Sequence, residues 1–201
     1  MKKIFKWPGG KFRELKRIET LLPANFDRII EPFAGSAAVS FKFEKPCVLN
    51  DLDRDVVNLY TTLQSKPMFD AFRKKIEFAK TLPYIPTGGA GYGITHSLET
   101  EYYNQRDILN LRDFSDPVKM AYAFYIVRQL GFSGMLRHSK ITKDQNVAYG
   151  WYKRFADNPQ IEQHQFLQKC VITKEDYSIT IQNNDKAGNF IFVDPPYRDR
   201  L

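Results

Sequence analysis

The chain of 201 residues contains little cysteine and no long apolar run. Its two cysteines, Cys47 and Cys170, are too few for a disulfide framework and lack zinc-site spacing. Each lies beside a β-type run, so we expect two small buried hydrophobic residues. No apolar stretch is long enough to cross a bilayer, and charge and Pro8 interrupt the start where a signal peptide would be apolar. We therefore expect a cytoplasmic protein without a membrane partner.

Internal repeats are also absent, and the only biased tract is the glycine-rich segment 88–93. No strand precedes this segment and no Lys-Ser/Thr follows it, so a flexible connector is favoured over a phosphate-binding loop. We expect no metal site. What the chain does have is an ordinary apolar fraction of 43% and a net charge of +7. These values predict one good core with room for a small subdomain, and they suit a polyanionic partner.

A strand–loop–helix–strand pattern lies in the first third of the chain. The apolar run 28–31 is followed by a loop of small residues at 34–38, a helix to about residue 43 and a second strand at 47–49. Asp53 then opens an amphipathic helix. This order is typical of a βαβ unit in a Rossmann-like sheet, so we predict an α/β fold.

Other elements divide the chain into a core and an insertion. We predict a helix over 11–22 and strands at 171–173 and 190–193. Between them, 67–80 and 98–111 have helical spacing, Pro117 starts an apolar helix, and 144–146 has the composition of a hairpin turn. We expect a core domain from 1–65 and 161–201, interrupted by a recognition insertion over 66–160.

Two loops have the composition of a nucleoside-cofactor site. Glu31-Pro32-Phe33-Ala34-Gly35-Ser36 follows the first strand, and its small residues let backbone amides approach a ligand. Asp51 ends the next strand about twenty residues on, where an acid accepts ribose hydroxyls. An ordinary βα turn and a helix N-cap are the alternatives, although Asp53 is better placed to be the cap.

The segments at the two ends of the chain carry further polar chemistry. Lys6-Trp7-Pro8-Gly9-Gly10-Lys11 places a flat ring and a cation on a rigid turn. The strand over 190–193 runs into Asp194-Pro195-Pro196-Tyr197, where proline must end the sheet ladder. Ligands of open α/β sheets bind at this edge.

These segments together resemble the Dam-like (α class) DNA adenine-N6 methyltransferases. KWPGGK at 6–11, EPFAGS at 31–36, NDLD at 50–53 and DPPY at 194–197 occur in the order of that family. The stretches 130–137 and 146–150 also look like the opening and close of its hairpin. The resemblance covers nearly the whole chain.

The resemblance implies S-adenosylmethionine as cofactor, with S-adenosylhomocysteine as product. The residues then expected to bind it are Trp7, Lys11, Glu31, Phe33, Ala34, Gly35, Ser36, Asp51, Asp176, Tyr177 and Asp194. The expected catalytic residues are Asp194, Pro195, Pro196 and Tyr197. The Asp194 carboxylate and the Pro195 carbonyl would hold the adenine amino group, and Tyr197 would stack on the flipped base.

The insertion would then bind double-stranded DNA. Between Lys119 and Arg154 there are seven Lys or Arg residues and one acid, interleaved with aromatics. A solvated basic face is the alternative. The residues expected to contact DNA are Phe132, Ser133, Met135, Arg137, Lys140, Lys143 and Asn146, with Arg137 as the base reader. Ser133 and Ala148 depart from the asparagine and proline common in the family, so a GATC target is not implied.

The family also carries a helix and several strands beyond the DPPY motif. The sequence therefore predicts a fragment, a degenerate relative, or a chain whose sheet a partner completes; otherwise we expect a monomer. Two other functions stay open: an amino-methyltransferase acting on RNA or protein, and a non-catalytic nucleic-acid-binding relative. By resemblance the setting is the bacterial cytoplasm, or the host cytoplasm for a phage protein.

Overall fold

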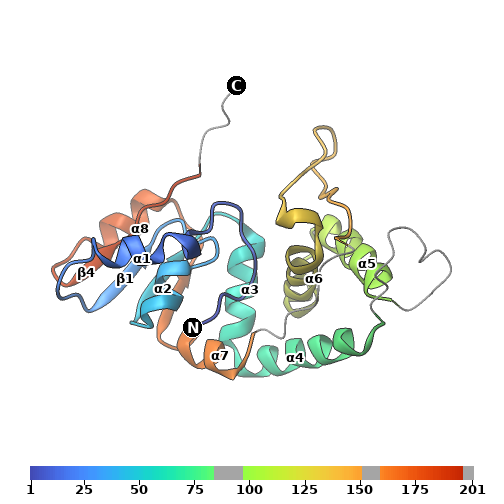
Figure 1. Ribbon diagram of the computed structural model, residues 1–201, viewed down its shortest axis with the longest axis horizontal. Helices are drawn as coiled ribbons and strands as arrows, with labels where there is room; N and C mark the ends of the chain where they lie inside the picture. The colour runs from blue at the N-terminus through green and yellow to red at the C-terminus, as the bar shows by residue number, and fades with distance from the viewer. Residues whose placement is uncertain (84–96, 151–158, 197–201) are drawn as a thin grey trace.

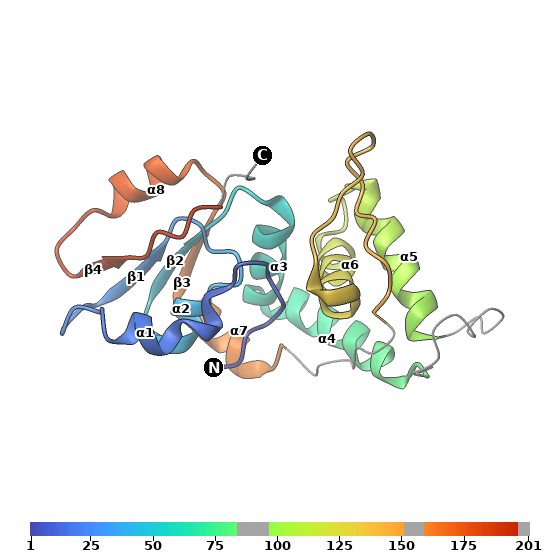
Figure 2. The same cartoon turned by 45° about the horizontal axis from the view of Figure 1, so that its top comes forward.

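Four parallel strands form one sheet in the computed structural model, which describes residues 1–83, 97–150 and 159–196. The sheet has the order β3-β2-β1-β4, as Figure 1 and Figure 2 show from two directions. The strands are β1 (Arg28–Glu31), β2 (Cys47–Asn50), β3 (Cys170–Thr173) and β4 (Asn189–Ile191). The predicted α/β fold is confirmed, and the strand positions agree with the sequence to within two residues at each end.

The first βαβ unit is present as predicted. β1 leads through a tight loop into α2 (Ala38–Phe43) and then into β2, which pairs with β1 in parallel. α3 (Arg54–Gln64) follows, and its N-cap is Asp53, whose Oδ1 accepts a hydrogen bond from Asp55 N at 2.9 Å. β2 and β3 lie on one side of β1, whereas β4 returns to the other side. The strand order thus reverses between β1 and β4, and such a switch point opens a crevice at the strands' carboxyl ends.

The first helix is shorter than the sequence predicts. In place of one helix over 11–22, a single turn η1 (Lys11–Arg13) precedes α1 (Leu15–Glu19). Neither element has a side-chain cap, and only Leu15 of α1 is buried, so propensity and packing both support a short helix. Two further helices were not predicted: α7 (Ile161–Leu167) and α8 (Tyr177–Asn184). α8 has one buried residue, Thr180, and therefore no apolar periodicity to read.

In its described residues, the predicted insertion consists of three helices and a hairpin, drawn green to gold in Figure 1. The helices are α4 (Lys66–Thr81), α5 (Leu98–Leu111) and α6 (Pro117–Leu130), close to the predicted ranges. α6 is buried from Met120 to Leu130 and contacts α3, α4 and α5, so it joins the predicted insertion to the sheet domain. After α6, the turn η2 (Phe132–Gly134) opens a hairpin that is closed by bridges Gly131↔Tyr149 and His138↔Gln145.

The predicted hairpin turn at 144–146 is wrong by several residues. The chain reverses over 139–144, where Ser139 N donates to Asp144 O at 2.8 Å and Lys143 N donates to Ser139 O at 3.1 Å. Lys143 takes the left-handed backbone conformation, with a φ of 62°. The Ser139 hydroxyl accepts from the amides of Ile141 and Thr142, and this local bonding, rather than the Asp-Gln-Asn composition, determines where the chain turns.

The two cysteines are buried, as predicted, but they are not unpaired. Cys47 on β2 lies directly opposite Cys170 on β3, with a Cα–Cα distance of 4.6 Å, and a disulfide joins them. This pairing could not be predicted from residue spacing, because 123 residues separate the two positions. Parallel strand register alone brings them together.

Candidate functional site

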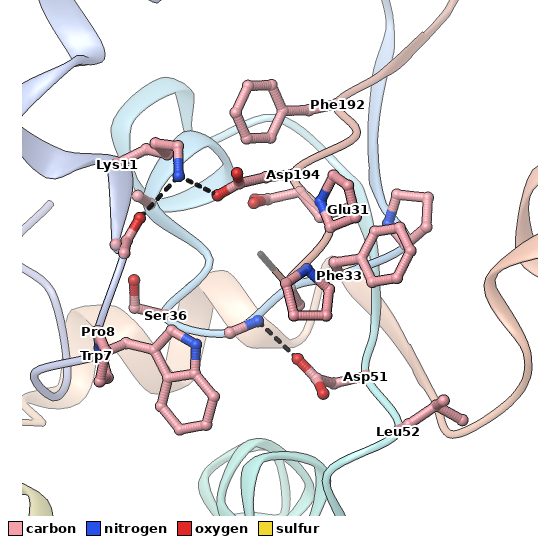
Figure 3. A pocket seen from close by; sticks show the side chains of 18 of the residues that line it. Trp7, Pro8, Lys11, Glu31, Phe33, Ser36, Asp51, Leu52, Phe192 and Asp194 are labelled. Carbon is pink, nitrogen blue, oxygen red and sulfur yellow. Dashed lines mark hydrogen bonds and ion pairs between the residues drawn. The ribbon is translucent and has the colours of Figure 1, made fainter. Parts of the chain in front are cut away.

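A pocket of about 530 Å³ lies at the switch point, beyond the carboxyl ends of β1 and β4. Its walls come from residues 7–11, the loop after β1 with the start of α2, the loop after β2, the hairpin at Leu136, the start of α8 at Tyr177 and the segment after β4. Figure 3 shows their side chains converging on one space. From the predicted cofactor and catalytic residues, the lining includes Trp7, Lys11, Glu31, Phe33, Ala34, Gly35, Ser36, Asp51, Tyr177, Asp194, Pro195 and Pro196.

The loop after β1 is held in an unusual backbone conformation. Gly35 has a φ of +46°, and a Cβ at this position would lie 2.7 Å from Trp7 Nε1. Only glycine tolerates both conditions. Two hydrogen bonds hold the peptide: Gly35 N donates to Asp51 Oδ2 at 2.8 Å, and Tyr60 Oη donates to Gly35 O at 2.7 Å. These hydrogen bonds therefore hold the main chain of the loop in a defined position, where it lines the pocket.

Asp51 lies where the sequence places it, but its carboxylate also supports the pocket itself. Its Oδ2 accepts from Gly35 N and its Oδ1 accepts from Asp53 N at 2.9 Å. Burial raises the pKa of Asp51, while these amide hydrogen bonds oppose the rise. Each carboxylate oxygen can accept a further hydrogen bond, so a ligand hydroxyl can share them.

The neighbouring Asn50 is a site residue that the sequence analysis missed. It is fully buried, and its Nδ2 donates to Pro32 O at 3.0 Å and to Glu175 O at 2.9 Å. Its Oδ1 accepts from Glu175 N at 2.9 Å. One amide therefore ties together the loops that follow β1 and β3. An amide at the end of an otherwise apolar buried strand was the available signal.

Two aromatic rings border the pocket near these loops. Phe33 and Tyr177 stack with centroids 5.1 Å apart and an interplanar angle of 30°. Asp176, predicted beside Tyr177 as a cofactor contact, does not line the pocket. Its Oδ1 accepts from Ser178 N at 2.9 Å and thereby caps α8, and the hydrogen bonds from Ser178 lower the pKa of Asp176. The structure thus brings Tyr177 to the site but turns Asp176 to a capping role.

An ion pair between Lys11 and Asp194 joins segments from near the two ends of the described chain. Lys11 Nζ lies 2.5 Å from Asp194 Oδ2 and donates to Gly9 O at 2.8 Å. Both side chains are partly buried, 19% and 24% exposed. The sequence analysis expects Lys11 to bind the cofactor, and in the structure it pairs with the protein's own carboxylate. This ion pair fixes one oxygen of Asp194 at the edge of the pocket (Figure 3).

Glu31 is the most deeply buried acid of the site, 2% exposed. Its Oε1 accepts a hydrogen bond from Ser40 N at 2.8 Å. Burial raises the pKa of Glu31 to about 7; the hydrogen bonds from Ser40 lower it and the charge of Asp194 raises it. The folded protein therefore holds this proton at pH values where the unfolded chain has released it. A cationic ligand nearby would favour the ionised form.

Glu31→Gln should flatten the pH dependence of stability. Since the folded pKa is raised from 4.5 to about 7, the wild-type free energy of unfolding falls as pH rises through this window and is level above it. Glutamine mimics the protonated acid, so the variant should be about 2 kcal/mol more stable at pH 8 and nearly unchanged at pH 4.5. Urea unfolding at several pH values measures this. Glu162→Gln, at an exposed position, is the matched control; parallel wild-type and Glu31→Gln profiles would contradict the assignment.

The predicted DNA-contacting residues gather on the hairpin. Phe132, Ser133, Met135, Arg137, Lys140, Lys143 and Asn146 are all exposed. Arg137 bridges the two arms: its Nε donates to Asn146 Oδ1 and its Nη2 donates to Asn146 O, both at 2.8 Å. These bonds use two of the five guanidinium N–H groups. The predicted base reader is therefore held in a defined position on the hairpin.

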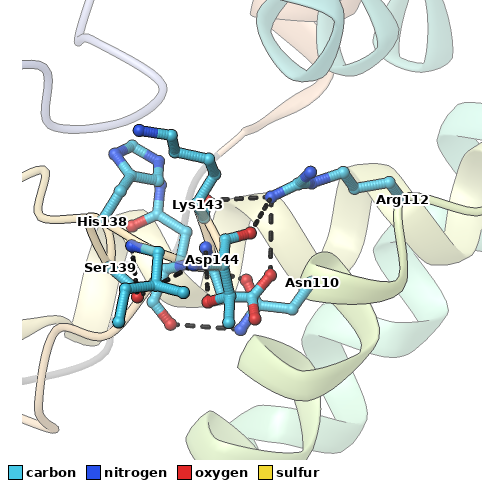
Figure 4. Close-up of polar contacts among 9 residues, drawn as sticks. Asn110, Arg112, His138, Ser139, Lys143 and Asp144 are labelled. Atoms are coloured by element: carbon cyan, nitrogen blue, oxygen red, sulfur yellow. Dashed lines mark hydrogen bonds and ion pairs between the residues drawn. The ribbon is translucent and has the colours of Figure 1, made fainter.

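The hairpin is anchored to α5 by two side chains shown in Figure 4. Asn110 Nδ2 donates to Gln145 O at 3.1 Å, and Gln145 N donates to Asn110 Oδ1 at 2.8 Å. Arg112 Nη2 donates to Lys143 O at 2.9 Å and lies 3.4 Å from Asp144 Oδ1. This anchoring was not apparent from sequence, since the partners are over 30 residues apart.

Further lining residues were also missed by sequence analysis. Leu52, Phe192 and Leu136 border the pocket. Leu136 is the most informative, because it belongs to the hairpin and brings the insertion to the wall of the core site. Tyr197, the last predicted catalytic residue, lies outside the described residues, as do Trp151, Tyr152 and the segment 88–93.

Two other features were sought in the part of the chain that the structure describes. No group of three or more His, Cys, Asp or Glu side chains there could hold a metal ion. Over the same residues, no helix combines the length and apolar character needed to cross a bilayer.

The strand order, the glycine loop after β1 and the Asp-Pro-Pro loop after β4 define a Rossmann-like methyltransferase fold. Comparison with known families makes this specific. The model of the D12 class N6 adenine-specific DNA methyltransferases matches residues 7–200, and the chain belongs to this family. Membership implies a methyl donor and a DNA substrate for the family as a whole.

Individual relatives support the same assignment. The chain is 32% identical over 206 residues to the type II methyltransferase M.CviBI of Paramecium bursaria Chlorella virus NC1A, covering 98% of this chain and 69% of the relative. It is 30% identical to the Retron Ec67 DNA adenine methylase of Escherichia coli, over 98% of this chain and 64% of that protein. It is 29% identical to the DNA adenine methylase of Haemophilus influenzae, over 96% of this chain and 63% of that protein. The chain thus spans about two thirds of the length of these relatives.

Proposed function

We propose that this chain binds S-adenosylmethionine in the pocket between β1 and β4 and transfers its methyl group to N6 of an adenine flipped out of duplex DNA. One observation carries the proposal. The Asp194-Pro195-Pro196 loop lies in the same pocket as Trp7 and Asp51, so an amine acceptor and a nucleoside-binding loop share one space.

The pocket fits this cofactor on physical grounds. A volume of about 530 Å³ is in the range that small-molecule sites occupy. Phe33 and Tyr177 offer aromatic faces for a purine ring, and Asp51 offers carboxylate oxygens for ribose hydroxyls. Because Gly35 has no side chain, a ligand can approach the main chain of this loop closely. Asp194 places negative charge in the region where a cationic ligand would lie, and such a ligand would also favour the ionised form of Glu31.

In the proposed mechanism the chain positions the amine and stabilises charge. When bound, the cofactor supplies a methyl group on a positively charged sulfur. The adenine amine is a weak nucleophile because its lone pair is delocalised into the ring. Asp194 Oδ1 and the Pro195 carbonyl would accept its two hydrogens and aim the lone pair at the methyl carbon, while Lys11 holds Asp194 Oδ2. Asp194 then stabilises the positive charge that develops on nitrogen. Tyr197 is proposed to stack on the flipped base.

The direct test is a methyl-transfer assay. The protein is incubated with labelled S-adenosylmethionine and unmethylated duplex DNA, and the DNA is digested to nucleosides. N6-methyladenine in the digest supports the proposal. Label in RNA or in protein, when these replace DNA, would support the amino-methyltransferase alternative. Tight DNA binding with no transfer to any of them would support a non-catalytic relative.

Asp51→Ala should weaken cofactor binding by about 1–3 kcal/mol, because a charge-assisted hydrogen bond and the anchor of Gly35 are both lost. Calorimetric titration with S-adenosylhomocysteine measures the loss. The control is Asp53→Ala, which removes the N-cap of α3 but no pocket wall. Equal affinities in the two variants would show that Asp51 has only a structural role.

Arg137→Ala and Lys143→Ala should affect DNA binding in different ways. If Arg137 reads a base, its loss relaxes the preference at one position by about 1–3 kcal/mol. Loss of Lys143 or Lys140, both exposed near the turn, should weaken all sequences alike and reduce the salt slope by about 0.9. Competition binding over a randomised duplex library at two salt concentrations separates the outcomes. Asn146→Ala is the control, because it removes the partner of Arg137 Nε but keeps the guanidinium and its bond to the backbone oxygen of residue 146. A uniform loss in Arg137→Ala would make Arg137 a phosphate contact.

A further inference from the structure

Arg128 is a buried cation, and within the described residues all of its side-chain hydrogen bonds go to backbone carbonyls. It lies on α6 and is 1% exposed. On one side, its Nε and Nη2 donate to Lys6 O at 3.2 and 3.1 Å. On the other side, Nη1 donates to Met135 O at 3.0 Å and Nη2 donates to Gly134 O at 2.9 Å. Among the described residues, no carboxylate lies within ion-pair distance of it.

If Arg128 served only to stabilise the fold, its burial as a cation would be an unfavourable choice. A buried charge is expensive to desolvate, and an apolar side chain of similar size in the same place is often as stable or more so. Burial accordingly lowers the pKa of Arg128 to about 10, which still leaves it charged at neutral pH. What an apolar residue cannot do is donate hydrogen bonds to carbonyl oxygens of two segments at once, and the planar guanidinium fork does this.

The two segments that Arg128 holds belong to the two halves of the proposed reaction. Lys6 immediately precedes Trp7, which lines the cofactor pocket and contacts the Gly35 loop. The guanidinium also lies 5.6 Å from the centroid of the Trp7 ring. On the other side, Gly134 and Met135 open the hairpin, and the next residue, Leu136, lines the same pocket.

We infer that Arg128 is a positioning residue that couples the cofactor site to the DNA-reading hairpin, because it fixes the Trp7 segment and the Gly134–Leu136 segment against each other. The inference rests on the proposed function. A ligand that orders Trp7 and the Gly35 loop would, through Arg128, also order the start of the hairpin. By linkage, DNA held by the hairpin would favour the cofactor by the same factor.

The neighbouring residue on α6 offers a matched control. Gln129 is also buried, 4% exposed, and its Nε2 donates to Ile4 O at 2.9 Å. Gln129 therefore anchors the N-terminal segment from the same helix, but within the described residues no hydrogen bond of its side chain reaches the hairpin. Arg112 gives the opposite control, since it anchors the hairpin to α5 and not to the N-terminal segment.

The experiment measures coupling rather than affinity. Binding of a fluorescein-labelled duplex pool is followed by anisotropy with and without saturating S-adenosylhomocysteine, for wild type and for Arg128→Met, Gln129→Met and Arg112→Met. We expect the ligand to change wild-type DNA affinity by about 10-fold, within the usual range of such coupling. We expect this factor to fall below about 2-fold in Arg128→Met and to persist in both controls, even where these lower the melting temperature as much.

A folded Arg128→Lys variant covers the case in which methionine prevents folding. One ammonium cannot span both segments in a planar fork, so its coupling should lie between those of wild type and Arg128→Met. Wild-type coupling in Arg128→Met or Arg128→Lys, or a wild type that binds both ligands without coupling, overturns the inference. A wild type that binds neither ligand overturns the proposed function itself and the inference with it.

Discussion

Asp194→Asn should reduce methyl transfer by at least about 10³-fold while DNA affinity changes less than about 3-fold. Asparagine keeps the shape of the side chain but removes the negative charge that the mechanism places beside the developing amine cation, and the loss of one such preorganised group costs about 10²–10³ in rate. The loss of the ion pair with Lys11 adds to this, since the side chain is then no longer held in its present position. In the proposed function, DNA affinity would come mainly from phosphate contacts on the hairpin, which the substitution does not touch.

Single-turnover methylation with saturating cofactor measures the chemical step separately from binding. Asp185→Asn removes an exposed carboxylate at the end of α8 and controls for the change in net charge. Near-normal turnover in Asp194→Asn would show that the reaction takes place elsewhere. A parallel loss of DNA binding would instead mean that Asp194 supports the fold of the binding surface.

Gly35→Ala should nearly abolish cofactor binding, with an affinity loss of about 100-fold or more. Two effects act together. The φ of +46° is strained for any residue with a Cβ, and the new methyl would lie 2.7 Å from Nε1 and 2.8 Å from Cδ1 of Trp7. Relief requires movement of either the loop or the indole, and both are pocket walls. Calorimetric titration with S-adenosylhomocysteine measures the loss.

Gly188→Ala is a closely matched control. Gly188 has a φ of +87°, and its added Cβ would lie 2.7 Å from Asp27 Oδ2, so strain and clash are of the same kind. It precedes the amino end of β4, at the edge of the sheet opposite the pocket. We expect both variants to lose about 1–2 kcal/mol of stability and only Gly35→Ala to lose the cofactor. Equal cofactor affinity in the two variants would mean that the Gly35 loop does not contact the ligand.

Much of the fold could be predicted because its signals are local. The apolar runs before Glu31 and Asn50 predict strands, and the small residues at 34–38 predict the turn between strand and helix. Asp53 was correctly predicted as the N-cap of α3, because a carboxylate directly before an amphipathic helix bonds the free amides of its first turn. The loops at the carboxyl edge of the sheet could also be predicted, because their motifs occur in the order of the family.

The errors arose where a competing local or distant contact prevailed. The hairpin turns at 139–144 because the Ser139 hydroxyl and the left-handed Lys143 close it, although Asp-Gln-Asn has the more turn-like composition. Asp176 was not predicted to cap α8 and does so because Ser178 lies within reach of its carboxylate, while its contact with the cofactor stays a prediction. Neither outcome can be predicted from the spacing of residues along the sequence.

By itself, the sequence determined the class of fold, the βαβ unit, the family and most residues of the pocket. These follow from periodicity, turn chemistry and motif order, which act over a few residues. Only the tertiary structure decided that Lys11 pairs with Asp194, that Asn50 ties two loops together, and that Cys47 and Cys170 form a disulfide. It also decided that Arg128 holds the Trp7 segment against the hairpin. The physical reason is that these partners lie far apart along the chain, so their contacts depend on strand order and helix packing, which residue spacing does not encode.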